Sequence, residues 1–169
     1  MYIITTNVVV SAKISGFDQN KILKNMFLAE FRPNDFPGIC VPLGKNAQIS
    51  LFDSGKITSK GASYVDWAIE SIDIFIKQLR KLGMDIIIVS KPVTSVIVFK
   101  ILLDGKIDIA KIKTLPEFKK MIRGFNSAHL QFPNASLQVF ADKITASSKT
   151  IDEIIPIAKM LEKYVTPKI

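Results

Sequence analysis

One segment of this chain occurs twice. The sequence LFDSGKIT at residues 51–58 returns in weakened form as VFADKIT at residues 139–145, which lies 87 or 88 residues further on. A long amphipathic segment follows each copy, with Ser63 and Thr150 as the expected helix caps. Such an offset indicates a duplicated unit of about half the chain. We therefore expect a first repeat over residues 1–84, a second, degenerate repeat over residues 85–169, and a pseudo-twofold molecule suited to a nearly twofold ligand.

Composition narrows the class of protein. Hydrophobic residues make up 48% of the 169, enough for one compact domain or two small fused lobes. No apolar run reaches the roughly 18 residues of a membrane span, and the N-terminus lacks the basic region of a signal peptide. We expect an intracellular protein, and the nucleus, the archaeal cytoplasm and a viral factory all remain open. A monomer or a weak homodimer is expected.

Charge favours an acidic partner. The formal net charge is +8, shared as +3 over residues 1–84 and +5 over residues 85–169. A basic folded body favours nucleic acid first, although a soluble lysine-rich protein explains the charge equally well.

Catalytic patterns are absent from the sequence. The single cysteine, Cys40, excludes an internal disulfide and a cysteine zinc cluster, and we expect it to be a small core residue. The single histidine, His129, excludes a multi-histidine metal site and is expected on the surface or in packing. Gly55-Lys56 lacks the P-loop spacing. We expect no enzyme activity, no cofactor and no metal.

Periodicity predicts an α+β fold. Apolar alternation predicts strands over residues 5–11, 39–43, 47–52, 56–60, 86–89, 93–103, 126–132, 135–140 and 143–147. Helical spacing predicts helices over residues 19–29, 63–82, 114–124 and from 150 onward. Pro42 suggests an edge strand, Asp104-Gly105 a possible hairpin, and Pro156 a kink. The helices at Ser63, Thr114 and Thr150 are expected to begin with capping boxes.

Strand alternation places Phe52 and Phe140 on a polar face. In residues 48–52 and 136–140, the residues Ile49, Leu51, Leu137 and Val139 share one side, and Ser, Gln and Phe share the other. Phe36 and Phe125 precede these two phenylalanines by 16 and 15 residues. Four such rings on a basic sheet suit insertion between base steps, although ordinary rim or core packing explains them equally well.

These motifs resemble the TATA-box-binding protein family. EFRPNDFPGI at residues 30–39 resembles that family's acidic-aromatic-x-Pro-x-x-Phe-Pro-Gly segment. LFDSGKI at residues 51–57, followed by GAS at 61–63, resembles its Leu-Phe-x-Ser-Gly-Lys signature, and TNVV at 6–9 resembles its Gln-Asn-Ile-Val strand. The resemblance is clear in residues 1–84 and weak in residues 85–169.

The resemblance implies a saddle, in which a curved antiparallel sheet of about ten strands carries four helices on its convex face. It implies a transcription initiation factor that binds and bends AT-rich double-stranded DNA through the minor groove, with a transcription factor B-like protein and RNA polymerase as partners. The implied DNA-binding residues are Asn7, Val9, Phe36, Pro37, Phe52, Lys56, Thr58, Lys60, Ser95, Ile97, Phe125, Phe140, Lys143 and Thr145. Phe118 is the alternative to Phe125.

The chain also departs from the family pattern. Ser95 stands for the second central Asn, Ser50 and Gln138 for groove-floor Leu, Lys60 for Thr, Pro42 for Arg, and Asn126 for Pro. Arg123-Gly124-Phe125 replaces the acidic run that contacts transcription factor B. The alternative function is therefore a protein-interaction module that has lost sequence-specific DNA binding; a weaker third is a nucleic-acid chaperone that recognises charge alone.

Overall fold

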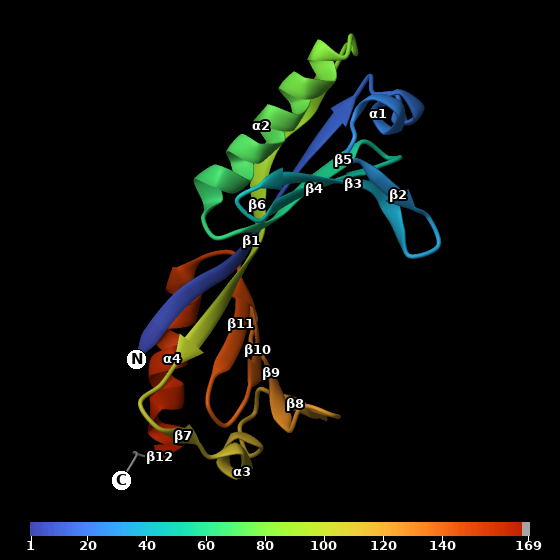
Figure 1. Ribbon diagram of the computed structural model, residues 1–169. Helices are drawn as coiled ribbons and strands as arrows, with labels where there is room; N and C mark the ends of the chain where they lie inside the picture. Colours follow the sequence, from blue (N-terminus) through green and yellow to red (C-terminus); the bar gives the residue numbers. More distant parts are fainter. Residues whose placement is uncertain (167–169) are drawn as a thin grey trace. The chain divides into compact units, whose positions relative to one another are not determined.

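The computed structural model describes residues 1–166 and has an α+β architecture (Figure 1). Its strands are β1 (Tyr2–Ser15), β2 (Glu30–Arg32), β3 (Phe36–Gly44), β4 (Ala47–Phe52), β5 (Lys56–Ala62), β6 (Ile87–Leu102), β7 (Lys106–Ile107), β8 (Phe118–Ile122), β9 (Ser127–Gln131), β10 (Ala135–Val139), β11 (Ile144–Ser148) and β12 (Val165–Thr166). Its helices are α1 (Gln19–Asn25), α2 (Val65–Lys81), α3 (Ile109–Ile112) and α4 (Ile154–Leu161), with 3-10 turns η1 (Ile151–Glu153) and η2 (Glu162–Tyr164).

Ten of the strands form one sheet in the order β2-β3-β4-β5-β1-β6-β11-β10-β9-β8, and β7 pairs with β12 separately. The flanking pairs, from β2–β3 to β5–β1 and from β6–β11 to β9–β8, are antiparallel. The prediction of an α+β fold with about ten antiparallel strands and four helices is confirmed.

The chain forms two compact units. Unit 2 comprises Asn7–Ser95, and unit 1 comprises Met1–Thr6 with Val96–Ile169. The long strands β1 and β6 each contribute one end to each unit. The compact units therefore exchange strand ends relative to the proposed repeats, and the repeat boundary at residues 84 and 85 stays a prediction about duplication.

In unit 2, α2 covers one face of the sheet by packing against β4 and β5. Its buried side chains follow helical spacing and include Ile72, Phe75 and Leu79. They meet strand residues that alternate with polar neighbours, such as Ile49, Leu51 and Ile57, all fully buried. α2 ends as predicted with Gly83 at φ +75°, where the Gly83 and Met84 amides donate to Arg80 and Leu79.

In unit 1, α4 covers one face of β9, β10, β11 and the end of β6. Ile154, Ala158 and Leu161 of α4 share a core with strand residues that include Phe99, Leu130, Leu137, Val139, Ile144 and Ala146. The Thr150 capping box is present, because its hydroxyl caps η1 while Glu153 accepts from the Thr150 amide. Each unit therefore has one sheet face covered by a helix and one without it.

One helix prediction is wrong, and another gives the helix too long. Residues 114–124 do not form a capped helix: Phe118–Ile122 is strand β8 and pairs with β9, while the short helix α3 begins earlier, at its cap Asp108. Ladder hydrogen bonds to β9 outweigh the local capping pattern there. The helix predicted over residues 19–29 ends at Asn25, and only Ile22 of its expected stripe is buried.

Several boundary predictions are also wrong. The cap of α2 is Tyr64 and not Ser63, and no side chain caps it. Residues 86–89 and 93–103 form one continuous strand, β6, and residues after Asp104 pair with β12, so no hairpin forms. Pro156 lies in the first turn of α4, where a missing amide is tolerated. Pro42 is not on an edge strand, but β2 ends opposite Cys40, so β3 lacks a second neighbour at Pro42.

A buried hydroxyl pair gives a test of how α2 is held. Ser71 on α2 and Ser59 on β5 are both 0% exposed, with their oxygens 2.6 Å apart, and the Ser71 hydroxyl donates to the Ala68 carbonyl. Ser71→Ala should lower the free energy of unfolding by about 1–3 kcal/mol because Ser59 loses its acceptor. The double variant with Ser59→Ala should recover part of that loss in urea denaturation; strictly additive losses would contradict this coupling.

Candidate nucleic-acid interface

The sheet faces not covered by helices are where the predicted site residues gather. We call the face of unit 2 opposite α2 the open face of unit 2, and the corresponding face of unit 1, opposite α4, the open face of unit 1. Buried and less buried residues alternate along β1, β5, β10 and β11, as expected when one face is covered.

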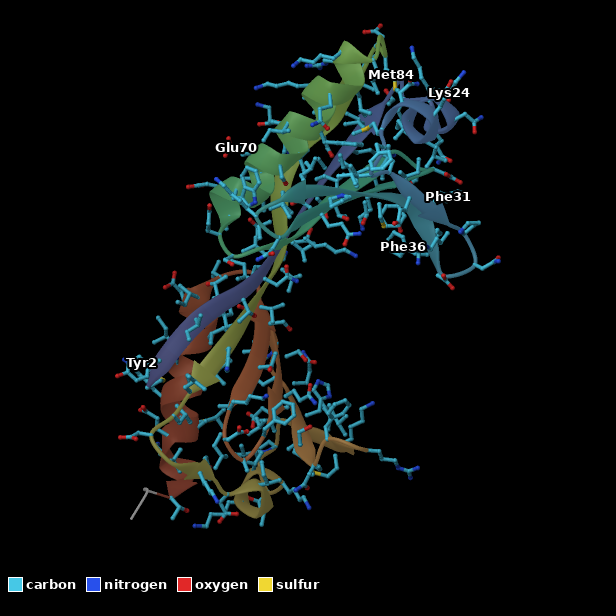
Figure 2. The ribbon with its side chains drawn as sticks, viewed as in Figure 1. Tyr2, Lys24, Phe31, Phe36, Glu70 and Met84 are labelled. Carbon is cyan, nitrogen blue, oxygen red and sulfur yellow. The ribbon has the colours of Figure 1, made fainter. Side chains whose placement is uncertain are left out.

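An aromatic pair lies at one end of the open face of unit 2. The ring centroids of Phe36 and Phe52 are 5.3 Å apart, and the planes are tilted by 58°. Gly38, opposite Phe52 in the β3–β4 ladder, makes room for them, since a Cβ there would lie 2.8 Å from the Phe36 ring. Both rings are half-buried and Pro37 is exposed. Figure 2 shows Phe36 at the β2–β3 end of the unit, away from α2.

Two lysines and a threonine share this face. Thr58 lies opposite Ser50 on β4 and opposite Ser11 on β1. Lys56 is exposed, and the Lys60 ammonium lies 5.2 Å from the centroid of the Phe36 ring. The cation and the aromatic ring therefore form one contiguous surface.

Asn7 has a fixed orientation. Its side-chain oxygen accepts a 2.6 Å hydrogen bond from the Gly61 amide. Gly61 has φ +91° and a Cβ there would lie 2.0 Å from the Asn46 carbonyl oxygen, so only glycine fits. With its oxygen engaged, Asn7 presents the NH₂ group as a donor. Val9 is half-buried on the open side of β1, and Ser95 donates to Ser11 at 2.7 Å.

Unit 1 has a related arrangement without an aromatic pair. Phe140 is half-buried with the Lys143 ammonium 5.1 Å from its ring centroid, and Thr145 lies opposite Lys100. Phe125, in the turn between β8 and β9, is 65% exposed, whereas Phe118 packs against the unit 1 core. Within residues 1–166 no ring pair joins Phe125 to Phe140.

Ile97 is misplaced by the sequence reasoning. It packs against the core of unit 1, on the same side of β6 as Phe99, so its side chain is not on the open face. The structure puts Val98 there instead, beside the predicted residue Thr145. A bulge in the β1–β5 ladder between Val8 and Val10 makes the repeat offset for this strand 89 and not 88, because Ser11 faces Thr58 and Lys100 faces Thr145.

One other expectation about burial is wrong: Cys40 is partly exposed on the open face and is not in the core. Ser50 lies on the open face, as strand alternation predicts, but is only 1% exposed. The two oppose each other in the ladder, with Cys40 Sγ 3.8 Å from Ser50 Oγ. Short side chains on neighbouring strands leave little area for solvent to reach.

Sequence reasoning missed three polar residues on the open face of unit 1. Lys100, Lys120 and His129 lie on β6, β8 and β9, and His129 Nε2 is 2.9 Å from the hydroxyl of Ser136. Alternation in residues 127–131 indicates the orientation of His129. The sequence gives no such indication for Lys120, because the pattern around it predicts a helix and the structure has strand β8. Only strand register brings these residues together.

The described residues offer no other evident centre. Across residues 1–166, no group of three or more His, Cys, Asp or Glu residues is arranged to hold a metal ion. In the same part of the chain, no helix combines the length and apolar character needed to cross a membrane.

Comparison with known proteins agrees with the sequence resemblance. Residues 3–82 match the family model for transcription factor TFIID (or TATA-binding protein, TBP). TATA-box-binding protein D of Halobacterium salinarum is 44% identical over 59 residues, covering 34% of this chain and 32% of its own. The TATA-box-binding protein of Methanococcus maripaludis is 37% identical over 83 residues, covering 48% and 46%. These matches therefore span less than half of each relative.

The fold comparison extends to the second half. A solved structure of Methanococcus jannaschii TBP superposes with a TM-score of 0.81 and covers 97% of this chain and 98% of its own, at 23% sequence identity. At that identity the likeness shows the fold alone. Residues 3–82 therefore carry the sequence pattern of the TATA-box-binding protein family, and nearly the whole chain has the fold of the Methanococcus jannaschii protein.

Proposed function

We propose that this protein binds AT-rich double-stranded DNA through the minor groove, bends it, and acts in transcription initiation. The observation that carries the proposal is the Phe36–Phe52 pair, two partly exposed rings 5.3 Å apart on a sheet face opposite a helix. Apolar side chains at such a position suit insertion between base steps, which unstacks and kinks a duplex. Phe140 and the exposed Phe125 are the proposed counterparts in unit 1.

Asn7 supports a preference for A·T pairs. In the minor groove, A·T and T·A pairs present only acceptors, the adenine N3 and thymine O2 atoms. The oxygen of Asn7 is engaged by Gly61, so its NH₂ group is free to donate to those acceptors. The half-buried Val9 and Thr58 add a shape-fitting floor. Flexible TA steps lower the energy of the required kink.

Electrostatics support a polyanionic ligand. The chain carries a net charge of +8, Lys60 and Lys143 lie beside the proposed wedges, and Lys56 is exposed on the same strand as Lys60. Lysines so placed neutralise phosphates on either side of an inserted ring. Pro37 and Ser95 are exposed, and we include them among the proposed DNA contacts. In unit 1, Thr145 is also a proposed DNA contact.

The proposed partners follow from the proposed role. A transcription factor B-like protein and RNA polymerase are the expected machinery, and DNA as ligand places the protein inside the cell or in a viral factory. The basic Arg123 and exposed Phe125 stand where the acidic factor-binding run is expected, so we propose that the partner contact there has altered charge.

The wedges are tested by DNA bending. Phe52→Ala and Phe140→Ala should each lower the bend reported by fluorescence energy transfer across a labelled AT-rich duplex, and weaken binding by about tenfold, or about 1.4 kcal/mol. Phe27→Ala is the matched control, because Phe27 is fully exposed but lies outside the proposed interface. If both wedge variants bend DNA as the parent protein does, the wedge assignment is wrong.

The phosphate contacts are tested by salt. Lys56→Ala should weaken binding to all AT-rich sequences by about the same factor. It should also reduce the magnitude of the slope of log K against log[salt] by about 1. Lys77→Ala, at an exposed position on α2 opposite the open face, should leave the slope unchanged. An unchanged slope for Lys56→Ala, measured by titration between low and moderate salt, would remove Lys56 from the interface.

A protein-interaction module is the second candidate. Phe27 is 100% exposed and Leu28 is 56% exposed beside a hollow of about 500 Å³ at the end of α1. Exposed apolar groups of this size favour a protein partner. A gel shift with AT-rich and GC-rich duplexes at two salt concentrations separates the candidates: binding that favours the AT-rich duplex supports the first, and no binding to either supports the second.

A further inference from the structure

The two open faces carry matching lines of residues that differ in chemistry. In unit 1, strand register aligns five polar residues across five neighbouring strands, one from each: Lys120, His129, Gln138, Thr145 and Lys100. We call this the unit 1 line. Since neighbouring strands are about 4.8 Å apart, the two terminal lysines stand about 19 Å apart, similar to the width of a duplex.

The equivalent line in unit 2 consists of residues with shorter side chains, and none of them is a lysine or an arginine. The same register aligns Glu30, Cys40, Ser50, Thr58 and Ser11. Only the threonine is shared, and Glu30 pairs with Arg32 at 2.9 Å. Ser50 is 1% exposed and does not reach beyond its neighbours. Compared with the equivalent positions in unit 2, the unit 1 line carries lysines at both ends and has longer side chains.

The unit 1 line is hollowed at its centre. A hollow of about 440 Å³ is lined by Lys120, His129, Gln138 and Thr145 together with neighbouring residues. The Gln138 amide nitrogen donates to Ser127 Oγ at 2.9 Å, which leaves the Gln138 carbonyl oxygen to accept. His129 Nδ1 is buried with no partner in the described structure. An unpaired buried polar atom is a sign that the hollow is incomplete without a ligand.

A protein surface that binds guanine in the minor groove needs space for the 2-amino group and a hydrogen-bond acceptor facing it. The guanine 2-amino group is the only donor in that groove and protrudes from its floor, so an apolar close-fitting face rejects G·C pairs. We propose that unit 1 accommodates a G·C pair, with the guanine 2-amino group donating to Gln138 and the terminal lysines contacting the two phosphate backbones. This inference rests on the proposed function and specifies its ligand: an AT-rich site with a G·C pair in the half bound by unit 1.

Inosine isolates the proposed contact, because it lacks only the 2-amino group. The probes are AT-rich duplexes carrying one G·C pair at each position in turn, and the same duplexes with inosine in place of guanine. At one or more positions the parent protein should bind the guanine duplex about three- to tenfold more tightly than its inosine counterpart. Gln138→Leu should abolish that preference, so that the guanine and inosine duplexes bind with equal affinity.

Two further variants make the test specific. Gln138→Met keeps an unbranched side chain but replaces the amide oxygen by a thioether sulfur, a far weaker acceptor. It should behave as Gln138→Leu does, which guards against a folding defect in one variant. Ser50→Leu changes the equivalent position in unit 2 and should retain the preference for guanine over inosine. Urea denaturation of each variant checks that the fold persists.

The outcomes separate the two proposals. Binding to all-A·T DNA with equal affinity for guanine and inosine duplexes at every position overturns this inference and leaves the proposed function standing. A guanine preference that survives both Gln138 variants also overturns it. Absence of binding to every duplex overturns both proposals.

Discussion

Burial of one face of each strand by a single helix is the interaction on which the rest of the structure depends. α2 in unit 2 and α4 in unit 1 each supply an apolar stripe, and Ile72, Phe75, Ile154 and Leu161 are all fully buried. Because side chains alternate along a strand, every second residue lies on the face of the sheet that no helix covers. The open faces are therefore a consequence of core formation, and their chemistry can change without loss of the core.

That separation explains how the open faces of the two units can differ while both units keep a helix-covered sheet. Core positions keep their apolar character in both units, as Ile57 and Ile144 show. On the open faces, equivalent positions carry Cys40 and Ser50 in unit 2 but His129 and Gln138 in unit 1. The two open faces therefore differ in chemistry, whereas the two cores do not.

The site on the first repeat was more predictable than the site on the second. Alternation alone put Phe52 and Thr58 on one face, since apolar and polar residues alternate along β4 and the start of β5. Sequence could not give Ile97 its side, because a bulge in the β1–β5 ladder, with its extra residue on β5, shifts the repeat offset by one residue and so reverses the face. Nor could it find Lys120, whose strand has a capping pattern typical of a helix.

The sequence by itself determined the α+β class, the helix-covered core and the family resemblance, and it predicts a duplication, because these depend on local periodicity and on motifs of adjacent residues. Tertiary structure alone decided which distant residues share a line across the sheet, such as Lys100 with Lys120, and that Asn7 has its oxygen engaged by Gly61. The physical reason is that strand register depends on bulges and ladder pairing between segments far apart in the chain, which no local pattern encodes.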